Sequence, residues 1–373
     1  MDDEVQVFLP YSERAACALI AGGVLNSVIC PPQVAEHPAV RGVADVRTMA
    51  SWPATYRRTL ERVLPHSRAL AGMNQSKMIW TRQARAEVDR KQSILTFPGA
   101  SLEIYREHHA PKIFHAVDAH PTAHNQSLHG VKARAEVHPR WWVARIAEEL
   151  SLASVILAPS SRVADQMVTN GVTSRKIEVV PYGVDLDLFS PRTDDRVAHH
   201  PSGELPSAIF VGQLSMRKGI DVLLEASDAV VTSIVVVGNR FSPPSRAAHF
   251  PANVRLVDPK SHTELRRMYL DADVFILPTR EDACSLVALE AAATGLPIIT
   301  TAANGAREVL ASELLDIVEP GSAEELAACL RKVPKLDWAM RVANRAAHLQ
   351  AGLYDWGEYA RAVEDVLRTR HAL

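Results

Sequence analysis

Short, almost uniformly apolar runs rich in β-branched residues alternate along this chain with longer segments of helical periodicity. Apolar runs of this kind are typical of strands covered on both faces, as in a parallel sheet. The alternation predicts βαβ units and a doubly wound α/β architecture. The predicted strands are Val5–Leu9, Ser93–Phe97, Lys112–Val117, Val155–Ala158, Ile177–Val180, Ala208–Val211, Ser233–Val237, Val254–Val257, Val274–Pro278 and Pro297–Thr300. The clearest predicted helices are Arg162–Asn170, Ile220–Ala229, His262–Ala272, Ser285–Ala293 and Ala323–Lys332.

The alternation occurs twice, and 373 residues are more than one typical core needs. Between the two sets, the stretch from Pro191 to Pro206 is polar and rich in proline, which is typical of a linker. We therefore expect one domain over residues 1–190 and a second over residues 191–355. Residues 39–91 are rich in Arg and Ala with few strand signals, and we expect them to form mainly helical insert material.

Composition excludes several classes of protein. The formal net charge is -2, which does not suggest a nucleic-acid binder. The four cysteines form no C-x-x-C pair, so we expect free thiols in a reducing cytoplasm rather than a zinc site or a disulfide framework. The start of the sequence is acidic, and no run reaches the roughly 18 apolar residues of a membrane-spanning helix. We expect a cytoplasmic protein, soluble or at most attached to the inner membrane surface.

A glycine-rich basic loop follows the strand that opens the second domain. The strand leads into Gly212, and Arg217, Lys218 and Gly219 precede the next helix. Glycine lets the backbone approach a phosphate closely, and two cations lie at the strand end where open α/β sheets bind ligands. The alternative is an ordinary solvated basic turn.

A second polar segment lies between a later strand and its helix. Asp282 lies in the loop, and Ser285, Leu286 and Val287 begin a helix whose free N–H groups would attract a diphosphate. Glu290 lies in an Ala-rich stretch that should be buried, so its carboxylate needs a partner such as a ribose diol. The alternatives are an ion pair for Glu290 and a simple loop acid for Asp282.

These segments together resemble glycosyltransferase family four, a group of retaining enzymes with the GT-B fold. The basic loop ends in Lys-Gly, and a carboxylate pair with seven residues between is followed by Ala-x-x-x-Gly-x-Pro. The resemblance is strong from about Val155 to the end. The segments that carry it are Arg217-Lys218-Gly219, Asp282 with Glu290, Ala291 to Gly295-Leu-Pro297, Asn304 to Glu308, Ala158-Pro-Ser160, and Val180-Pro-Tyr-Gly-Val-Asp185 with Phe189.

The resemblance implies two Rossmann-like domains facing across a cleft, an acceptor domain over 1–190 and a nucleotide-sugar donor domain over 191–355. The final helix, 356–373, would pack back on the first domain. The implied reaction is sugar transfer with retention of anomeric configuration. The implied roles are donor phosphate binding by Arg217 and Lys218, ribose binding by Glu290, sugar contact by Asp282, backbone approach at Gly212, and a base pocket near Lys260 and Leu265.

Three positions depart from the family pattern. Asp282 stands where Glu is usual, so the reach of its carboxylate is one methylene shorter. Gln213 stands where Arg is common, and Arg217 is expected to supply that charge. The first strand leads to Pro10-Tyr-Ser-Glu-Arg14 instead of a glycine-rich turn, so the acceptor side is expected to be unusual.

Candidates for a polar group near the reacting carbon follow a strand of the first domain. His120 and Asp118 could assist the acceptor hydroxyl or contact the donor sugar, or could be ordinary loop residues. Arg145 and Glu149 are weaker candidates. A set of arginines in the first half could face an anionic membrane or a solvated helix face: Arg57, Arg58, Arg62, Arg68, Arg82 and Arg85.

We therefore expect a glycosyltransferase that uses a UDP- or GDP-linked sugar as co-substrate. The expected acceptor is a glycan, a lipid-linked or a small molecule, in cell-envelope polysaccharide biosynthesis. With no Asp-x-Asp motif and a basic pair for the diphosphate, no metal is expected. A catalytically inactive nucleotide-sugar-binding scaffold and a nucleotide-sugar epimerase of the same fold are the alternatives.

Overall fold

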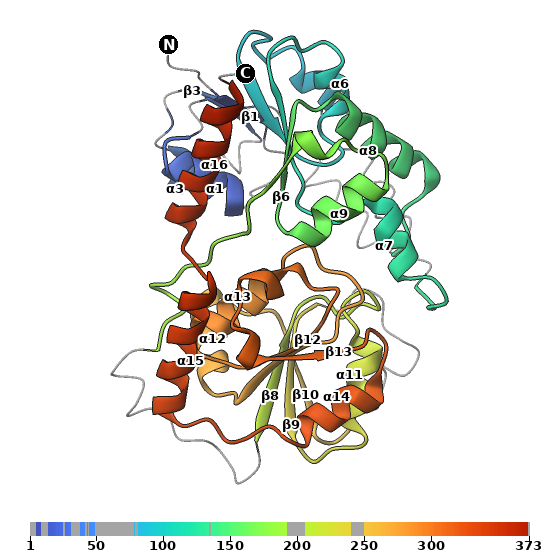
Figure 1. Cartoon of the computed structure of the whole chain (residues 1–373), viewed down its shortest axis with the longest axis vertical. Coiled ribbons are helices and arrows are strands. Elements are labelled where there is room, and N and C mark those ends of the chain that lie inside the picture. The colour runs from blue at the N-terminus through green and yellow to red at the C-terminus, as the bar shows by residue number, and fades with distance from the viewer. Residues whose placement is uncertain are drawn as a thin grey trace. The chain divides into compact units, whose positions relative to one another are not determined.

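The computed structural model describes residues 5–8, 14–24, 27–30, 38–41, 43, 45–48, 78, 81–133, 136–191, 206–239 and 250–371. The chain divides into two compact units. The first contains Met1–Asn125, Val137–Tyr182 and Trp356–Leu373, and the second contains Gln126–Glu136 and Gly183–Asp355. Each unit has its own parallel sheet with helices on both faces (Figure 1).

The sheet of the first unit has seven strands in the order β3-β2-β1-β4-β5-β6-β7, all paired in parallel. The order reverses between β1 and β4, as in a doubly wound fold. The strands are β1 (Val5–Phe8), β2 (Ser27–Cys30), β3 (Asp45–Thr48), β4 (Ser93–Thr96), β5 (Lys112–His115), β6 (Val155–Ala158) and β7 (Ile177–Val179).

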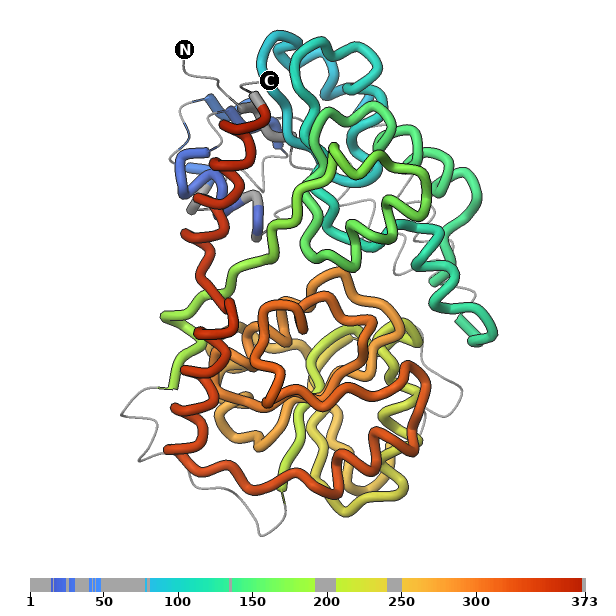
Figure 2. Tube along the Cα trace, in the orientation of Figure 1, coloured from blue at the N-terminus to red at the C-terminus, as the bar shows by residue number. Residues whose placement is uncertain are grey.

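Helices α1, α3 and α16 cover one face of this sheet, and α6, α8 and α9 cover the other (Figure 1). The last helix, α16, lies beside α1 (Figure 2). Its Tyr359 is 1% exposed and reaches the end of β5. The helices of this unit are α1 (Arg14–Ala21), α3 (Pro38–Arg41), α6 (Leu102–Tyr105), α7 (Pro121–Ser127, whose last two residues group with the second unit), α8 (Arg140–Leu152), α9 (Ser161–Thr169), η1 (Ser174–Lys176) and α16 (Trp356–His371).

The second unit has a six-stranded parallel sheet in the order β10-β9-β8-β11-β12-β13, which reverses between β8 and β11. Helices α11 and α14 lie on one side and α12, α13 and α15 on the other (Figure 1). The strands are β8 (Ser207–Val211), β9 (Ser233–Val237), β10 (Val254–Val257), β11 (Val274–Leu277), β12 (Ile298–Thr301) and β13 (Leu315–Val318). The helices are α11 (Ile220–Ser227), α12 (His262–Leu270), α13 (Leu286–Ala293), η2 (Gly305–Val309), η3 (Ser312–Leu314), α14 (Ala323–Leu330) and α15 (Trp338–Ala351).

Burial and capping explain why these segments adopt these structures. Every residue of β4, β6, β11 and β12 is buried, as expected for apolar strands covered on both faces. Ser261 begins α12 with a capping box, in which its side chain and that of Glu264 each bond the backbone of the other. Three other helices, α9, α14 and α15, begin at N-cap residues whose side chains accept from a backbone N–H of the first turn: Ser160, Ser322 and Asp337.

The predicted strands and helices are confirmed, with ends shifted by a few residues. Three strands were not predicted: β2, β3 and β13. The expectation that residues 39–91 are mainly helical is wrong at β3, whose Asp-Val-Arg-Thr sequence pairs in parallel with β2. A short polar strand at a sheet edge carries too weak a pattern to be recognised. Much of the rest of 39–91 lies outside the described residues.

The division into units also differs from the expected boundary at 190/191. The second unit begins at Gly183, because Val184 N–H donates to the carbonyl of Tyr354 and the ring of Phe189 packs against Tyr269. Residues 126–136 also belong to it, although the chain on both sides of them belongs to the first unit.

His115, at the end of β5, predicts a pH dependence of stability. Its ring stacks on Tyr182, and its Nε2 lies 2.6 Å from the hydroxyl of Tyr359. Burial lowers its pKa to about 4. In the unfolded chain the pKa is near 6.5, so the unfolded state binds the proton first as the pH falls. The free energy of unfolding should therefore be at its full value above pH 6.5 and lose up to about 3 kcal/mol by pH 4.

Urea unfolding at several pH values, for the wild type and His115→Gln, measures this contribution. The glutamine amide can keep a hydrogen bond to Tyr359 but takes up no proton. The variant should show a clearly shallower loss of stability between pH 6.5 and pH 4. Equal slopes in the two proteins would assign the loss to other groups, including His120, whose pKa burial also lowers to about 4.

Candidate active site

The candidate site lies at the carboxyl edge of the second sheet, where the strand order reverses. Strands β8 and β11 are neighbours there, and each leads into a loop and then into a helix. In open α/β sheets, ligands bind where the loops from two such strands separate. The basic loop follows β8, and the acidic loop with Asp282 follows β11, so the topology brings the two predicted segments together.

Gly219 fixes the geometry of the basic loop. It has a φ of 74° and precedes α11 as its N-cap. A Cβ at this position would lie 2.0 Å from the carbonyl oxygen of Pro278, at the end of β11. Only glycine combines this backbone conformation with so close an approach. The basic loop and the loop after β11 are therefore in close contact at Gly219, and Arg217 and Lys218 immediately precede this contact.

The two cations of the basic loop are paired with acids of the other loop. The ammonium of Lys218 forms an ion pair with the carboxylate of Asp282. The guanidinium of Arg217 donates to the main-chain carbonyl of Glu281 at 3.1 Å, and lies 3.8 Å from its carboxylate. Loss of hydration lowers the pKa of Lys218, and Asp282 opposes this shift. An incoming diphosphate would compete with Asp282 for the same cation.

The acidic loop is itself pinned by the loop after β12. Asp282 N–H donates to the carbonyl of Ala303 at 3.0 Å, and Gly305 N–H donates to the carbonyl of Asp282 at 2.9 Å. The fully buried Asn304 side chain accepts from Ser285 N–H at 3.4 Å. These contacts place the loop after β12 beside Asp282 and hold the start of α13 in place.

The first turn of α13 offers donors to a ligand. Ser285 is its N-cap, yet the Ser285 side chain does not cap the helix. Its Oγ is buried and makes no hydrogen bond within the part of the chain that the structure describes. Leu286 and Val287 follow at the first helical positions, where N–H groups have no partner inside the helix. An anion bound here would satisfy these donors.

Glu290 is 1% exposed on the same helix and accepts a hydrogen bond from the hydroxyl of Tyr269 at 3.2 Å. Lys260 and Leu265 lie after β10, at the start of α12. Lys260 pairs with Glu264 at 3.5 Å, and Leu265 is buried.

The first-unit candidates differ in environment. Asp118 is exposed, whereas His120 is 3% exposed. The Nδ1 of His120 accepts from Thr122 N–H at 3.3 Å, and its Nε2 has no hydrogen-bond partner within the described residues. His120 lines a cavity of about 210 Å³ together with Asn170, Gly171 and Lys176, among others.

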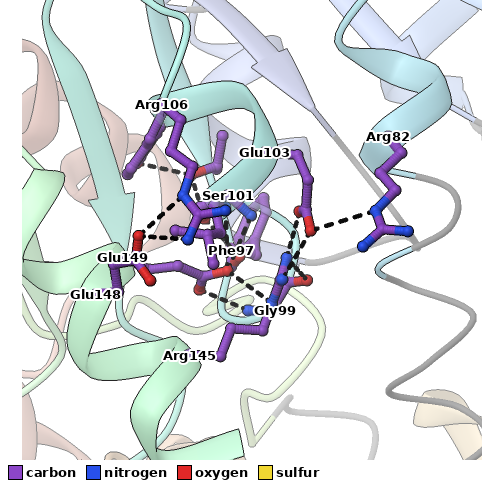
Figure 3. Close-up of polar contacts among 12 residues, drawn as sticks. Arg82, Phe97, Gly99, Ser101, Glu103, Arg106, Arg145, Glu148 and Glu149 are labelled. Carbon is purple, nitrogen blue, oxygen red and sulfur yellow. Dashed lines mark hydrogen bonds and ion pairs between the residues drawn. The ribbon is translucent and has the colours of Figure 1, made fainter. Parts of the chain in front are cut away.

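Arg145 and Glu149 are used by the chain itself. Glu149 is fully buried and accepts the N–H groups of Gly99, Ser101 and Leu102 at 2.8, 3.3 and 3.1 Å (Figure 3). Burial raises the pKa of Glu149 to about 7, against the opposing charge of Arg145. In the structure, these two weaker candidates hold the turn after β4.

Four of the six arginines considered for membrane contact, from Arg57 to Arg68, lie outside the described residues. The other two are paired: Arg85 lies 2.8 Å from Glu107, and Arg82 lies 3.9 Å from Glu103. No helix of the described residues is both long and apolar enough to cross a bilayer. Among those same residues, no group of three or more His, Cys, Asp or Glu side chains is placed to hold a metal ion.

Sequence reasoning missed two arginines that support the site. Arg280 forms a double ion pair with Asp221 at 2.7 Å and donates to the carbonyl of Met216 at 2.6 Å, so it ties the basic loop to β11 and α11. Arg341, on α15, is fully buried beneath α12 and α13. Arg280 lies within the acidic motif and could have been noticed there, whereas no local pattern points to Arg341.

Two family models match this chain, one mainly over each of the two units. Residues 191–348 match the family model "Glycosyl transferases group 1", and residues 84–188 match "Glycosyltransferase Family 4". The chain belongs to glycosyltransferase family four. Its resemblance to that family and the GT-B class of fold, both inferred from the sequence, are thus confirmed.

Among curated relatives, D-inositol 3-phosphate glycosyltransferase of Streptosporangium roseum is 29% identical over 242 residues, 55% of this chain and 55% of the relative. The sulfoquinovosyl transferase of Arabidopsis thaliana is 23% identical over 231 residues, 59% of this chain and 45% of the relative. The chain thus spans about half the length of the curated relatives it matches.

Among solved structures, sucrose-phosphate synthase from Thermosynechococcus elongatus has a TM-score of 0.71 at 18% identity, over 99% of both chains. Anabaena HepE in complex with UDP has a TM-score of 0.68 at 13% identity, over 98% of this chain and 100% of that one. At these identities, the likeness shows the shared GT-B fold alone.

Proposed function

We propose that this protein is a retaining glycosyltransferase, which moves a sugar from a nucleotide-sugar donor to an acceptor hydroxyl. One observation carries the proposal: Arg217 and Lys218 after β8, and the open first turn of α13 after β11, lie on the two strands between which the sheet order reverses. Two cations and unpaired helix N–H groups at one sheet edge suit a diphosphate.

In the proposed mechanism, the donor diphosphate replaces Asp282 as the ion-pair partner of Lys218. Lys218 and Arg217 then neutralise the charge that develops as the nucleoside diphosphate leaves. The released carboxylate of Asp282 accepts hydroxyl groups of the transferred sugar. The acceptor hydroxyl attacks the anomeric carbon from the face that the diphosphate leaves, and its proton passes to the departing phosphate oxygen, so the anomeric configuration is retained. The basic pair supplies the positive charge, so the proposal requires no metal.

The donor is proposed to be UDP-linked, with GDP as the alternative base. Anabaena HepE, which has the same fold, is known in complex with UDP and with UDP-glucose, and this supports UDP as the first choice. Among the acceptors expected from the sequence, a small phosphorylated molecule is favoured over a cell-envelope glycan, because the similar enzymes include a D-inositol 3-phosphate glycosyltransferase and a sucrose-phosphate synthase. Lys260 and Leu265 would lie toward the base, and His120 or Asp118 toward the acceptor.

Thermal stabilisation by UDP, GDP and ADP, followed by product analysis with the corresponding sugar nucleotides, tests the proposal. Transfer yields a new glycoside, and the proton coupling at its anomeric carbon reports retention or inversion. An altered sugar nucleotide would instead identify an epimerase. Nucleotide binding with neither product, over a broad acceptor panel, would favour the inactive scaffold. No binding of any nucleotide would contradict the site assignment.

Glu290→Gln is expected to weaken UDP binding about 10-fold, because a ribose diol loses charge-assisted hydrogen bonds. The amide oxygen still accepts from Tyr269, so the fold should be kept. Calorimetric titration with UDP and with its 2′,3′-dideoxy analogue measures the effect. The analogue should bind the variant and the wild type equally, and the exposed Glu324→Gln serves as control. Equal losses for both ligands would remove Glu290 from the ribose site.

A further inference from the structure

Residues 126–136 bring an acidic side chain to the basic loop. Within the second unit, Leu128, Ala133 and Met216 form a small buried cluster, with Val131 packed against it. This apolar contact fixes the segment against the loop that carries Arg217. The segment ends at Glu136, which is 4% exposed.

The carboxylate of Glu136 bonds the backbone of the basic loop with both oxygens. Oε1 accepts from Met216 N–H at 2.9 Å, and Oε2 accepts from Arg217 N–H at 2.9 Å. The partners are 80 and 81 residues apart in sequence. A carboxylate that accepts two convergent N–H groups at this distance forms charge-assisted hydrogen bonds, which are stronger than neutral ones.

The hydrogen bonds of the loop show why this contact matters. The N–H groups from Leu214 to Ile220 each have an acceptor, and five of these acceptors lie within the loop itself or on Asn239, after β9. The two remaining N–H groups, of Met216 and Arg217, depend on Glu136. The carbonyl of Arg217 accepts two further hydrogen bonds, from the Thr279 hydroxyl and the Arg280 N–H, both in the loop after β11.

The backbone of Arg217 is therefore held from both sides, by Glu136 at its N–H and by the loop after β11 at its carbonyl. The direction of a side chain follows from its backbone. We propose that Glu136 is a positioning residue for the diphosphate of the donor, which holds the loop so that Arg217 and Lys218 are presented together. This inference rests on the proposed function of the same loop.

Replacing Glu136 with alanine should free both N–H groups without changing either cation. UDP binding should weaken at least about 10-fold, since a preorganised pair of cations loses its fixed geometry. Amide hydrogen exchange at Met216 and Arg217 should accelerate, with no nucleotide present. Sodium formate, compared with sodium chloride at equal ionic strength, should restore part of the UDP affinity by placing a carboxylate in the vacated position.

Glu136→Gln is the second variant, in case the alanine protein is poorly folded. Its amide can accept from one N–H group only, so we expect an intermediate loss. Glu107→Gln is the matched control, because that carboxylate is partly exposed and pairs with arginines far from the loop in sequence.

The outcomes separate the two proposals. If the wild type binds no nucleotide, the proposed function fails, and amide exchange still reports whether Glu136 holds the loop. Unchanged exchange at Met216 and Arg217 in both variants would overturn the positioning role. Faster exchange with unchanged UDP affinity, or tighter UDP binding in the alanine variant, would also overturn it. The last result would mean that Glu136 instead competes with the ligand.

Discussion

Replacing Lys218 with methionine is expected to lower the turnover of the nucleotide sugar, as kcat/KM, by about 100- to 1,000-fold. The methionine keeps most of the volume of the lysine stem but removes the charge that faces the leaving diphosphate. The effect should fall mainly on kcat if the cation acts on charge that develops during departure. Steady-state kinetics with UDP-linked sugars measures the change in kcat and kcat/KM, and UDP titration measures the change in binding.

Removing Lys218 also leaves the carboxylate of Asp282 without its cation at a site where it is only 6% exposed. Lys218→Met combined with Asp282→Asn separates the two effects, because the double variant has no unpaired charge. Lys332→Met, at an exposed position in the turn after α14, is the control. If the single variant turns over and binds UDP like the control, the basic loop is not the donor site.

Replacing Arg341 with methionine should destabilise the second unit by about 3–5 kcal/mol. The guanidinium is fully buried and donates four hydrogen bonds to main-chain carbonyls at the ends of α12 and α13. Loss of hydration lowers its pKa to about 10, so it stays charged at neutral pH. The four acceptors are the carbonyls of Tyr269, Thr294, Leu270 and Ala272.

Without the guanidinium, these carbonyls face an apolar side chain with no water to replace it. Urea unfolding followed by a probe in the second unit measures the loss. Arg341→Lys keeps the charge but loses the planar guanidinium, so its free energy of unfolding should lie between those of the wild type and Arg341→Met. Arg361→Met, whose side chain is exposed on α16, should change stability by less than about 0.5 kcal/mol. A loss below about 1 kcal/mol in Arg341→Met would contradict the capping role.

The parts of the fold that follow from local pattern could be predicted. The strands around the site are uniformly apolar because helices cover both faces, and that pattern is visible in sequence. The strand β13 was missed because only Val318 in it is buried, so its run lacks the apolar signal. The strand β3 was missed for a related reason, since a polar edge strand is fixed by its pairing with β2 rather than by its own residues.

The candidate site shows the same limit. Arg217, Lys218, Asp282 and Ser285 lie between the end of a strand and the start of the next helix, so sequence position alone indicated a shared sheet edge. Glu136 could not be recognised in this way. Its partners are the N–H groups of a loop 80 residues away, and backbone donors leave no mark in the sequence of the residue that binds them.

The order in which the chain visits its two units limits how the protein can be dissected. It passes from one unit to the other after Asn125, Glu136, Tyr182 and Asp355. No single contiguous fragment therefore carries either unit whole. An expression fragment of Gly183–Asp355 would contain both cations yet leave the N–H groups of Met216 and Arg217 without their carboxylate, so a failure of that fragment to bind nucleotide would say little about the intact chain.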